Sequence, residues 1–168
     1  MKYALMIRND ALSKETALKI KEGLKDFFMY DDQNPDLVIS IGGDGTILEA
    51  VHHYLNKDCC FVGIHTGTLG FYTDYQVDQV DQFIKDVTSR EFTTMKRYLL
   101  EIKVNKKNQS ETYYALNELR LDQGLQAQVI HVYINDVLFE VFRGNGLCVS
   151  TPSGSTAYNK SLGGAIIY

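Results

Sequence analysis

The 168-residue sequence lacks several features that would place it in common classes of protein. Its apolar runs fall well short of the roughly 18 residues that a membrane-spanning helix needs. Its opening residues, Met-Lys-Tyr-Ala-Leu-Met-Ile-Arg, are too short an apolar stretch for a signal peptide. The three cysteines and four histidines do not fall at the spacings of a zinc site. These absences predict a cytoplasmic protein with no membrane partner, no structural metal and reduced cysteine thiols, which we expect to be buried.

Three familiar catalytic or nucleotide-binding motifs are also missing. The sequence has no Walker motif and no Gly-x-Ser-x-Gly elbow. The glycine series that begins at Gly43 has Leu48 where a standard dinucleotide fingerprint needs its third glycine. A net charge of −4 gives no general attraction for nucleic acid, so we expect no nucleic-acid partner.

The first half of the sequence alternates between strand and helix patterns. Apolar runs at 2–7, 37–41 and 60–64 indicate buried strands, while residues 13–28 carry apolar side chains at helical spacing behind Ser13, a suitable N-cap residue. Such an α/β alternation predicts a Rossmann-like parallel sheet with helices, whose ligand crevice lies beyond the carboxyl ends of the strands. Loops 42–45 and 65–70 both follow such strands, so we expect them to face one site.

The pattern changes near residue 93, where polar and apolar side chains begin to alternate. The runs 98–104 and 112–121 flank a turn, and a second pair of runs is joined by Asn135-Asp136, a plausible tight hairpin turn. We therefore predict a mainly antiparallel β region after the α/β region.

The last segment resembles a turn followed by a short helix. Ser155 or Thr156 is placed to cap this helix after a Pro and Gly turn. The sequence then stops within an apolar pattern at 163–168, so we expect the natural protein to continue. The predicted domains are residues 1–92, an α/β domain, and residues 93–168, an all-β domain that is incomplete at its C-terminus.

The most informative segment is Ile-Gly-Gly-Asp-Gly-Thr at 41–46, between a buried strand and a helical pattern. Glycines in this position let backbone N–H groups and a helix N-terminus approach a phosphate. A carboxylate beside phosphates is repelled by them, so Asp44 either accepts a proton from an attacking hydroxyl or holds a cation. For the segment alone, an ordinary Asp-Gly turn is the alternative. The arrangement favours phosphoryl chemistry.

Several motifs together resemble those of bacterial NAD kinases over essentially the whole chain. They are the glycine loop with Asp44, Gly63-Ile-His-Thr-Gly-Thr-Leu-Gly-Phe71, Asn117-Glu118, Arg143-Gly-Asn-Gly146 and Thr151-Pro-Ser-Gly-Ser-Thr-Ala-Tyr-Asn-Lys-Ser161. The glycine loop alone is shared with lipid kinases and, more distantly, with phosphofructokinases. The resemblance implies transfer of the γ-phosphoryl group of ATP, carried with Mg²⁺, to the 2′-hydroxyl of the adenosine ribose of NAD, giving NADP.

The resemblance also implies roles for individual residues. Asp44 corresponds to the proton acceptor, and the backbone near the phosphates is that of Gly42, Gly43 and Gly45. The residues implied to bind the dinucleotide or line its pocket are Phe71, Tyr72, Asn117, Glu118, Arg143, Asn145, Thr156, Ala157, Tyr158, Asn159, Lys160 and Ser161. No residue is implied as a metal ligand. The second region becomes the start of an all-β dinucleotide-binding domain, and the resemblance suggests a homodimer or homotetramer.

Two positions depart from the family pattern, and two other functions stay open. Asn145 stands where aspartate is common, which weakens an interaction with a cationic or multiply donating group. His65 stands where many relatives have asparagine, and it adds a titratable group. A lipid kinase of the diacylglycerol or sphingosine type would share the glycine loop but have no use for Asn117-Glu118. A non-catalytic dinucleotide-binding protein is favoured if Asn145 prevents substrate binding.

Overall fold

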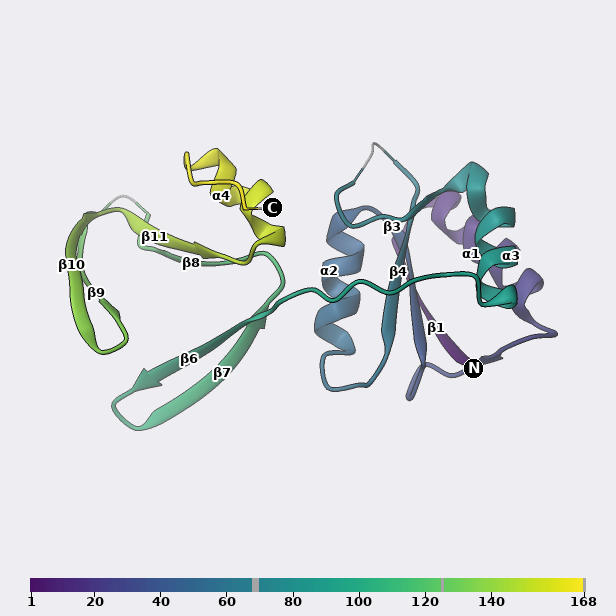
Figure 1. Ribbon diagram of the computed structural model, residues 1–168, viewed down its shortest axis with the longest axis horizontal. Helices are drawn as coiled ribbons and strands as arrows, with labels where there is room; N and C mark the ends of the chain where they lie inside the picture. Colours follow the sequence, from purple (N-terminus) through teal and green to yellow (C-terminus); the bar gives the residue numbers. More distant parts are fainter. Residues whose placement is uncertain (68–69, 125, 168) are drawn as a thin grey trace. The chain divides into compact units, whose positions relative to one another are not determined.

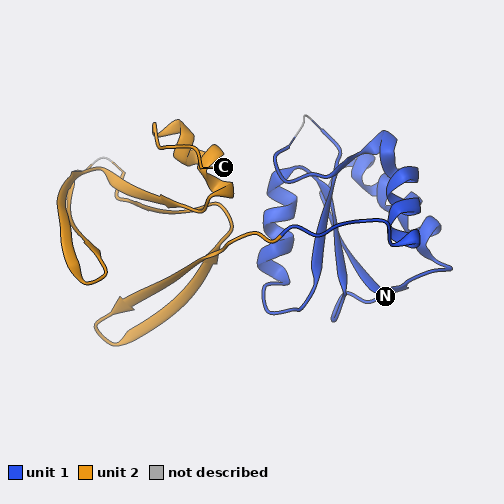
Figure 2. Cartoon of the chain, viewed as in Figure 1, with its two compact units in different colours: residues 1–95 blue, residues 96–168 orange. Residues whose placement is uncertain are grey.

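The computed structural model describes residues 1–67, 70–124 and 126–167. The chain forms two compact units, residues 1–95 (unit 1) and residues 96–168 (unit 2), shown in Figure 2. Each unit has its own architecture, so we describe them separately.

Unit 1 is built on a five-stranded parallel sheet in the order β2-β1-β3-β4-β5 (Figure 1). The strands are β1 (Lys2–Ile7), β2 (Met29–Tyr30), β3 (Leu37–Gly42), β4 (Cys60–His65) and β5 (Tyr75–Gln76). All six residues of β3 are buried, as expected for a central strand covered on both faces. The predicted parallel sheet is confirmed.

Helices cover both faces of this sheet. They are α1 (Ala11–Leu24), α2 (Asp44–His53) and α3 (Val80–Ser89), the last preceded by a 3₁₀ turn at Val77–Gln79. One core cluster joins α1 and α3 to the sheet through Ile20, Phe83 and Ile39, and a second joins α2 to the opposite face through Ala50 and Val38. Burial of these apolar side chains holds the three layers together.

The strand order identifies where a ligand should bind. From β1 the chain passes through α1 to β2 on one side, whereas from β3 it passes through α2 to β4 on the other side. The winding therefore reverses between β1 and β3. In open α/β sheets ligands bind beyond the carboxyl ends of the strands at such a switch point. Here that point lies at the loops that follow Ile7 and Gly42.

The ends of α1 differ from the prediction. Asp10, not Ser13, is the N-cap, and its carboxylate accepts hydrogen bonds from the backbone N and the hydroxyl of Ser13 at 3.0 and 2.7 Å. The helix ends at Leu24, so Phe27 and Phe28 lie beyond it. Phe27 is largely exposed, and Phe28 packs against the core from the following turn. The apolar spacing runs past the end of the helix for two reasons. Phe28 packs against the core from the turn, and Phe27 is apolar although it is exposed.

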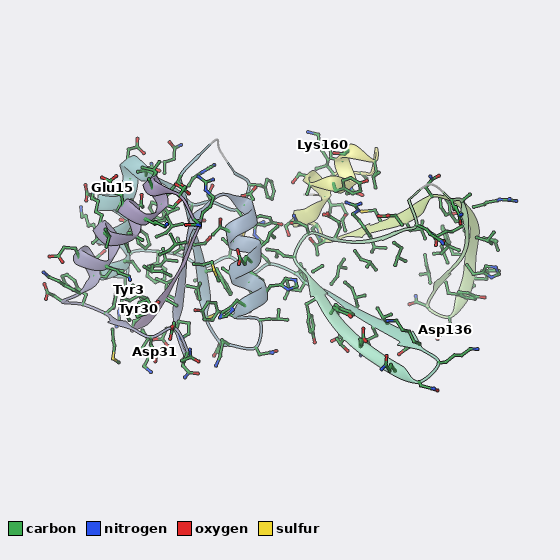
Figure 3. All side chains as sticks on the ribbon, turned by 180° about the vertical axis from the view of Figure 1, so that it is seen from behind. Tyr3, Glu15, Tyr30, Asp31, Asp136 and Lys160 are labelled. Carbon is green, nitrogen blue, oxygen red and sulfur yellow. The ribbon has the colours of Figure 1, made fainter. Side chains whose placement is uncertain are left out.

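Tyrosine side chains stabilise both edges of the sheet in unit 1. The rings of Tyr3 and Tyr30 meet edge to face at 5.5 Å, near Asp31 (Figure 3). At the other edge the Tyr75 hydroxyl donates to Asp86 at 3.0 Å, which ties β5 to α3. Burial, followed by this bond to Asp86, raises the pKa of Tyr75 to about 12, so the hydroxyl remains a donor at neutral pH.

The described residues of unit 2 form three antiparallel strand pairs. They are β6 (Leu100–Lys106) with β7 (Gln109–Ala115), β8 (Glu118–Asp122) with β11 (Gly146–Ser150), and β9 (Gln128–Ile134) with β10 (Val137–Gly144). Asn135 and Asp136 have φ values of 50° and 63°, as a tight hairpin turn between β9 and β10 requires (Figure 3 labels Asp136 at its tip). The predicted antiparallel region and hairpin turn are confirmed.

Other details of unit 2 differ from the prediction. The run 112–121 is not one strand, because β7 ends at Ala115 and β8 begins at Glu118. A 3₁₀ turn (Ser153–Thr156) and the short helix α4 (Tyr158–Ser161) follow β11, and neither has a side-chain cap. Ser155 is fully buried and donates to the carbonyl of Pro152 instead. The expected capping role of Ser155 or Thr156 is therefore wrong.

The structure tests the expectation that the three cysteines are buried thiols. Cys59, Cys60 and Cys148 are free thiols, but Cys60 is exposed, so the expectation that all three are buried is wrong. Burial raises the pKa of the Cys59 and Cys148 thiols.

In the described part of the chain, no helix combines the length and hydropathy needed to cross a membrane, and no three potential metal ligands cluster together.

Candidate active site

The glycine loop places Asp44 at the carboxyl end of β3. Gly43 is the N-cap of α2 and Asp44 is its first residue, so the carboxylate lies at the positive end of the helix dipole. A side chain at Gly42 would overlap Thr46 of the same helix. The tight turn from strand to helix therefore requires glycine at this position.

The Asp44 carboxylate joins this loop to the loop that follows β4. It accepts hydrogen bonds from the backbone N of Phe71 at 2.8 Å and of Tyr72 at 2.9 Å. The backbone N of Thr66 also donates to the carbonyl of Gly42 at 3.0 Å. The predicted convergence of the two loops is thus confirmed for their described residues.

Close approach of the two loops depends on a second glycine. A Cβ atom at Gly70 would overlap the Asp44 carboxylate. Gly43 and Gly45 differ, since a Cβ atom on either would meet no described atom within 4 Å. Packing of the described residues therefore explains glycine at position 70, whereas it sets no steric requirement for glycine at 43 or 45.

The geometry leaves Asp44 able to act as a base. Two N–H groups hold the carboxylate in one orientation, and an ionised carboxylate has about four lone-pair sites, so sites remain on both oxygens. Asp44 is only partly buried. A fixed, partly exposed carboxylate at the switch point can accept a proton from a bound hydroxyl.

Phe71 and Tyr72 contact Asp44 through their backbones. The side chain of Phe71 is half exposed and that of Tyr72 is 8% exposed, and their rings meet edge to face with centroids 5.4 Å apart. The predicted pocket-lining role of the rings stays a prediction. Their backbone role was not visible in the sequence, because it depends on how the loop folds back.

His65 stabilises the same loop. The buried ring lies at the end of β4, and its Nδ1 accepts a hydrogen bond from the backbone N of Gly67 at 2.9 Å. This bond requires an unprotonated Nδ1. The side-chain oxygen of asparagine makes the same bond, to the backbone two residues ahead, in an Asx turn.

We therefore expect His65→Asn to keep catalytic efficiency within about threefold of the parent. His65→Leu, which fills similar space without an acceptor, should lower it at least tenfold, roughly the effect of one lost hydrogen bond. Steady-state kinetics of the two variants check this prediction. Equal activities for His65→Leu and the parent would show that this bond does not hold the loop.

In unit 2 the structure joins two of the motifs noted in the sequence. Thr151, which is 2% exposed, donates its hydroxyl to the carbonyl of Leu116 at 2.6 Å, and its backbone N donates to the carbonyl of Asn117 at 2.8 Å. The same hydroxyl accepts from the backbone N of Gly154 at 2.9 Å. Thr151 therefore fixes the segment 151–155 against Asn117-Glu118.

Two residues that the resemblance assigns to dinucleotide binding are Glu118 and Tyr158, and the structure shows what surrounds each side chain. One carboxylate oxygen of Glu118 is buried and has no hydrogen-bond partner among the described residues. The guanidinium carbon of Arg120 lies 4.2 Å from the centre of the Tyr158 ring, and Asp122 holds that guanidinium at 3.0 Å. A buried acceptor without a donor costs free energy unless a ligand or water supplies one.

Other candidate residues are exposed or already engaged. Arg143, Lys160 and Ser161 are exposed, and Thr156 and Ala157 are partly buried. The Asn159 amide donates to the carbonyls of Ser155 and Ala165 at 3.2 and 2.9 Å, which supports the turn around it.

Asn145, the unusual residue of the Arg-Gly-Asn-Gly motif, has a partner of its own. Its amide donates to the carbonyl of Gly124 at 3.2 Å. An ionised aspartate could not make this bond, because it has no donor. Asparagine at position 145 therefore differs from aspartate in two respects: it lacks the negative charge, and it donates a hydrogen bond to the Gly124 carbonyl.

Three residues had no role predicted from the sequence: Arg8, which donates to the carbonyl of Thr66 at 3.3 Å in unit 1, and Arg120 and Thr151 in unit 2. Arg8 directly follows β1, and a basic residue at the carboxyl edge of a parallel strand was the available signal. Arg120 gave no comparable signal, and Thr151 was noted only as the first residue of a motif, since the roles of both depend on contacts across strands.

Comparisons with known proteins agree with this architecture. Profiles of the ATP-NAD kinase N-terminal domain and of the ATP-NAD kinase C-terminal domain match residues 6–92 and 116–168. NAD kinase 1 of Bacillus cereus is 46% identical over 173 residues, and an NAD kinase of Staphylococcus aureus is 44% identical over 175 residues. Each match covers 100% of this chain and 65% of the relative.

Two solved structures share the fold. Yeast NADH kinase in complex with NADH gives a TM-score of 0.89 at 22% identity, covering 100% of this chain and 62% of that one. An NAD kinase from Archaeoglobus fulgidus in complex with ATP gives 0.74 at 23% identity, covering 99% and 67%.

The fold and the glycine loop place the chain among α/β proteins that carry a Gly-Gly-Asp-Gly turn after a parallel strand. The two domain matches narrow this class: the chain belongs to the NAD kinase family. It spans 65% of the length of the curated relatives named above.

Proposed function

We propose that the protein is an NAD kinase, which transfers the γ-phosphoryl group of ATP to the 2′-hydroxyl of the adenosine ribose of NAD and so forms NADP. The observation that carries this proposal is the Asp44 carboxylate, held by two backbone N–H groups at the switch point of a parallel sheet. Family membership supports it, as does the space beside Gly43 and Gly45, where the described residues outside α2 and the adjoining chain place no atom within 4 Å of an added Cβ.

In the proposed reaction the ribose 2′-oxygen attacks the γ-phosphorus, and the bond from that phosphorus to the β–γ bridging oxygen breaks, releasing ADP. The proton of the 2′-hydroxyl passes to Asp44. Phosphoryl transfer has a loose transition state, so the acceptor oxygen needs little early deprotonation. The main tasks of Asp44 are therefore to orient the hydroxyl and to take its proton as the new bond forms.

Among the described residues no three potential metal ligands lie together, and the family resemblance names no protein ligand for a metal. We propose that Mg²⁺ enters on the phosphates of ATP, where it neutralises charge.

We also propose that the dinucleotide is bound by the unit 2 residues that the resemblance identified. The buried Glu118 oxygen without a donor supports this role, since a ribose hydroxyl would supply one. Asn117 lies beside Thr151, and Tyr158 is held against Arg120. The protein is further proposed to be a cytoplasmic homodimer or homotetramer, as the family resemblance suggests.

A coupled assay tests the function. The full-length protein, incubated with ATP, Mg²⁺ and NAD, should form NADP that an NADP-specific dehydrogenase detects. Phosphorylation of diacylglycerol or sphingosine without NADP formation would instead identify a lipid kinase. Binding of NAD without any turnover would identify a non-catalytic dinucleotide-binding protein, and either result would overturn the proposal.

A further inference from the structure

Arg8 lies at the switch point of unit 1 and takes no part in the proposed transfer of a proton to Asp44. It directly follows β1, and its backbone N donates to the carbonyl of Ile41 on β3 at 2.9 Å. Its Cβ lies 3.0 Å from where a Cβ on Gly42 would stand, and its Nη1 lies 3.6 Å from the equivalent point at Gly67. The side chain therefore runs from the end of β3 towards the loop that follows β4.

The fold fixes the guanidinium of Arg8 in this place. Its Nε donates to Asp10 at 2.7 Å, and its Nη2 donates to the carbonyl of Thr66 at 3.3 Å. Asp10 is itself held by Ser13, whose hydroxyl lies 2.8 Å from that of Thr66. The bond from Arg8, followed by those from Ser13, keeps the pKa of Asp10 well below its usual range, so the carboxylate stays ionised.

An exposed ion pair of this kind adds little to stability. Arg8 and Asp10 retain 44% and 32% side-chain exposure. Stability alone therefore gives little reason for the chain to orient this guanidinium beside two glycine-containing loops.

The arrangement answers an electrostatic difficulty of the proposed reaction. Asp44 repels phosphates at the point where they must bind. A guanidinium has five N–H donors, and the contacts to Asp10 and Thr66 use only part of them. The remaining donors form a rigid fork that matches phosphate oxygens.

We propose that Arg8 binds the phosphates of the nucleotide donor and offsets their repulsion by Asp44. This inference rests on the proposed function, because it takes the donor to be a nucleoside triphosphate. Asp10 is then a positioning residue that orients the fork, and the open space beside Gly43 and Gly45 receives the phosphates.

The test compares Arg8→Met, which keeps the apolar stem, with Arg8→Lys, which keeps the charge but not the fork. In the full-length protein, Arg8→Met should raise the KM for ATP about 10- to 100-fold, the effect of losing a charged hydrogen bond. The KM for NAD should change by less than about threefold, and Arg8→Lys should fall between the parent and Arg8→Met. A purely structural role would not separate the two KM values.

Lys57→Met is the matched control. Lys57 precedes β4 and so lies at the amino ends of the parallel strands, whereas Arg8 lies at their carboxyl ends. Its ammonium group donates to the Asn34 side chain at 3.0 Å. This variant loses the same charge, so general electrostatic attraction predicts equal effects for the two methionine variants. The proposal predicts that Lys57→Met leaves the KM for ATP within about twofold of the parent.

Calorimetric titration without NAD separates this inference from the proposed function. Inorganic tripolyphosphate and ATP should bind the parent protein, and Arg8→Met should weaken both about 10- to 100-fold. This result supports the role of Arg8 even if NAD proves not to be the acceptor. Equal binding by the parent and Arg8→Met, or no binding of either probe to the parent, overturns the inference even if NADP is formed.

Discussion

Replacing Asp44 by asparagine is expected to lower the turnover of NAD by about 10²- to 10⁴-fold, the usual contribution of a positioned general base. Asparagine has nearly the same shape but cannot take up the proton of the 2′-hydroxyl. The dissociation constants for NAD and ATP should change much less than kcat, because the proton moves only during the reaction. Steady-state kinetics and calorimetry on the full-length variant measure both quantities.

The structural role of Asp44 requires a control. An asparagine amide turns an N–H₂ group towards one of the two backbone N–H groups that the carboxylate now binds. Asp74→Asn makes the same chemical change at a carboxylate that accepts from the backbone N of Gly63 at 2.9 Å. We expect Asp74→Asn to reduce kcat by less than about tenfold. Similar losses of kcat in both variants would show that Asp44 only holds the loop and does not accept the proton.

Replacing Thr151 by valine should destabilise unit 2 by about 2–4 kcal/mol, because it leaves two buried backbone groups without partners. These are the N–H of Gly154 and the carbonyl of Leu116, both bonded to the Thr151 hydroxyl. The same change frees the segment beside Asn117. We therefore expect the KM for NAD to rise at least tenfold, a response that urea unfolding and kinetics measure separately.

Thr151→Ser provides the matched control, since it keeps the hydroxyl and removes only a methyl group. Its cost should be near 1 kcal/mol, with the KM for NAD within about threefold of the parent. If valine and serine at position 151 gave equal stability, the hydroxyl contacts could not be what holds this segment.

The sequence was sufficient for most of the scaffold because its signals are local. Apolar runs such as 37–41 mark buried strands, and Asn135-Asp136 marks a hairpin turn, without knowledge of what packs against them. The glycine loop likewise indicated where β3 ends, and the alternation of strands and helices indicated that two loops would meet at its edge.

Features that depend on tertiary contacts could not be predicted in this way. The N-cap of α1 is Asp10, which also accepts a hydrogen bond from Arg8, whereas the spacing of apolar residues alone indicated Ser13. The aromatic side chains of Phe71 and Tyr72 led to the prediction that they line the pocket. The contacts that hold Asp44 come instead from their backbone N–H groups. Thr151 begins a recognised motif, but its role in holding Asn117 follows only from the folded structure.

The central claim is tested most directly by a crystal structure of the full-length protein with bound NAD. The account predicts an Asp44 carboxylate oxygen about 2.6–3.2 Å from the 2′-oxygen of the adenosine ribose, or linked to it through one water. An ordered adenosine ribose beyond the reach of Asp44, with the carboxylate still bonded only to Phe71 and Tyr72, would contradict it.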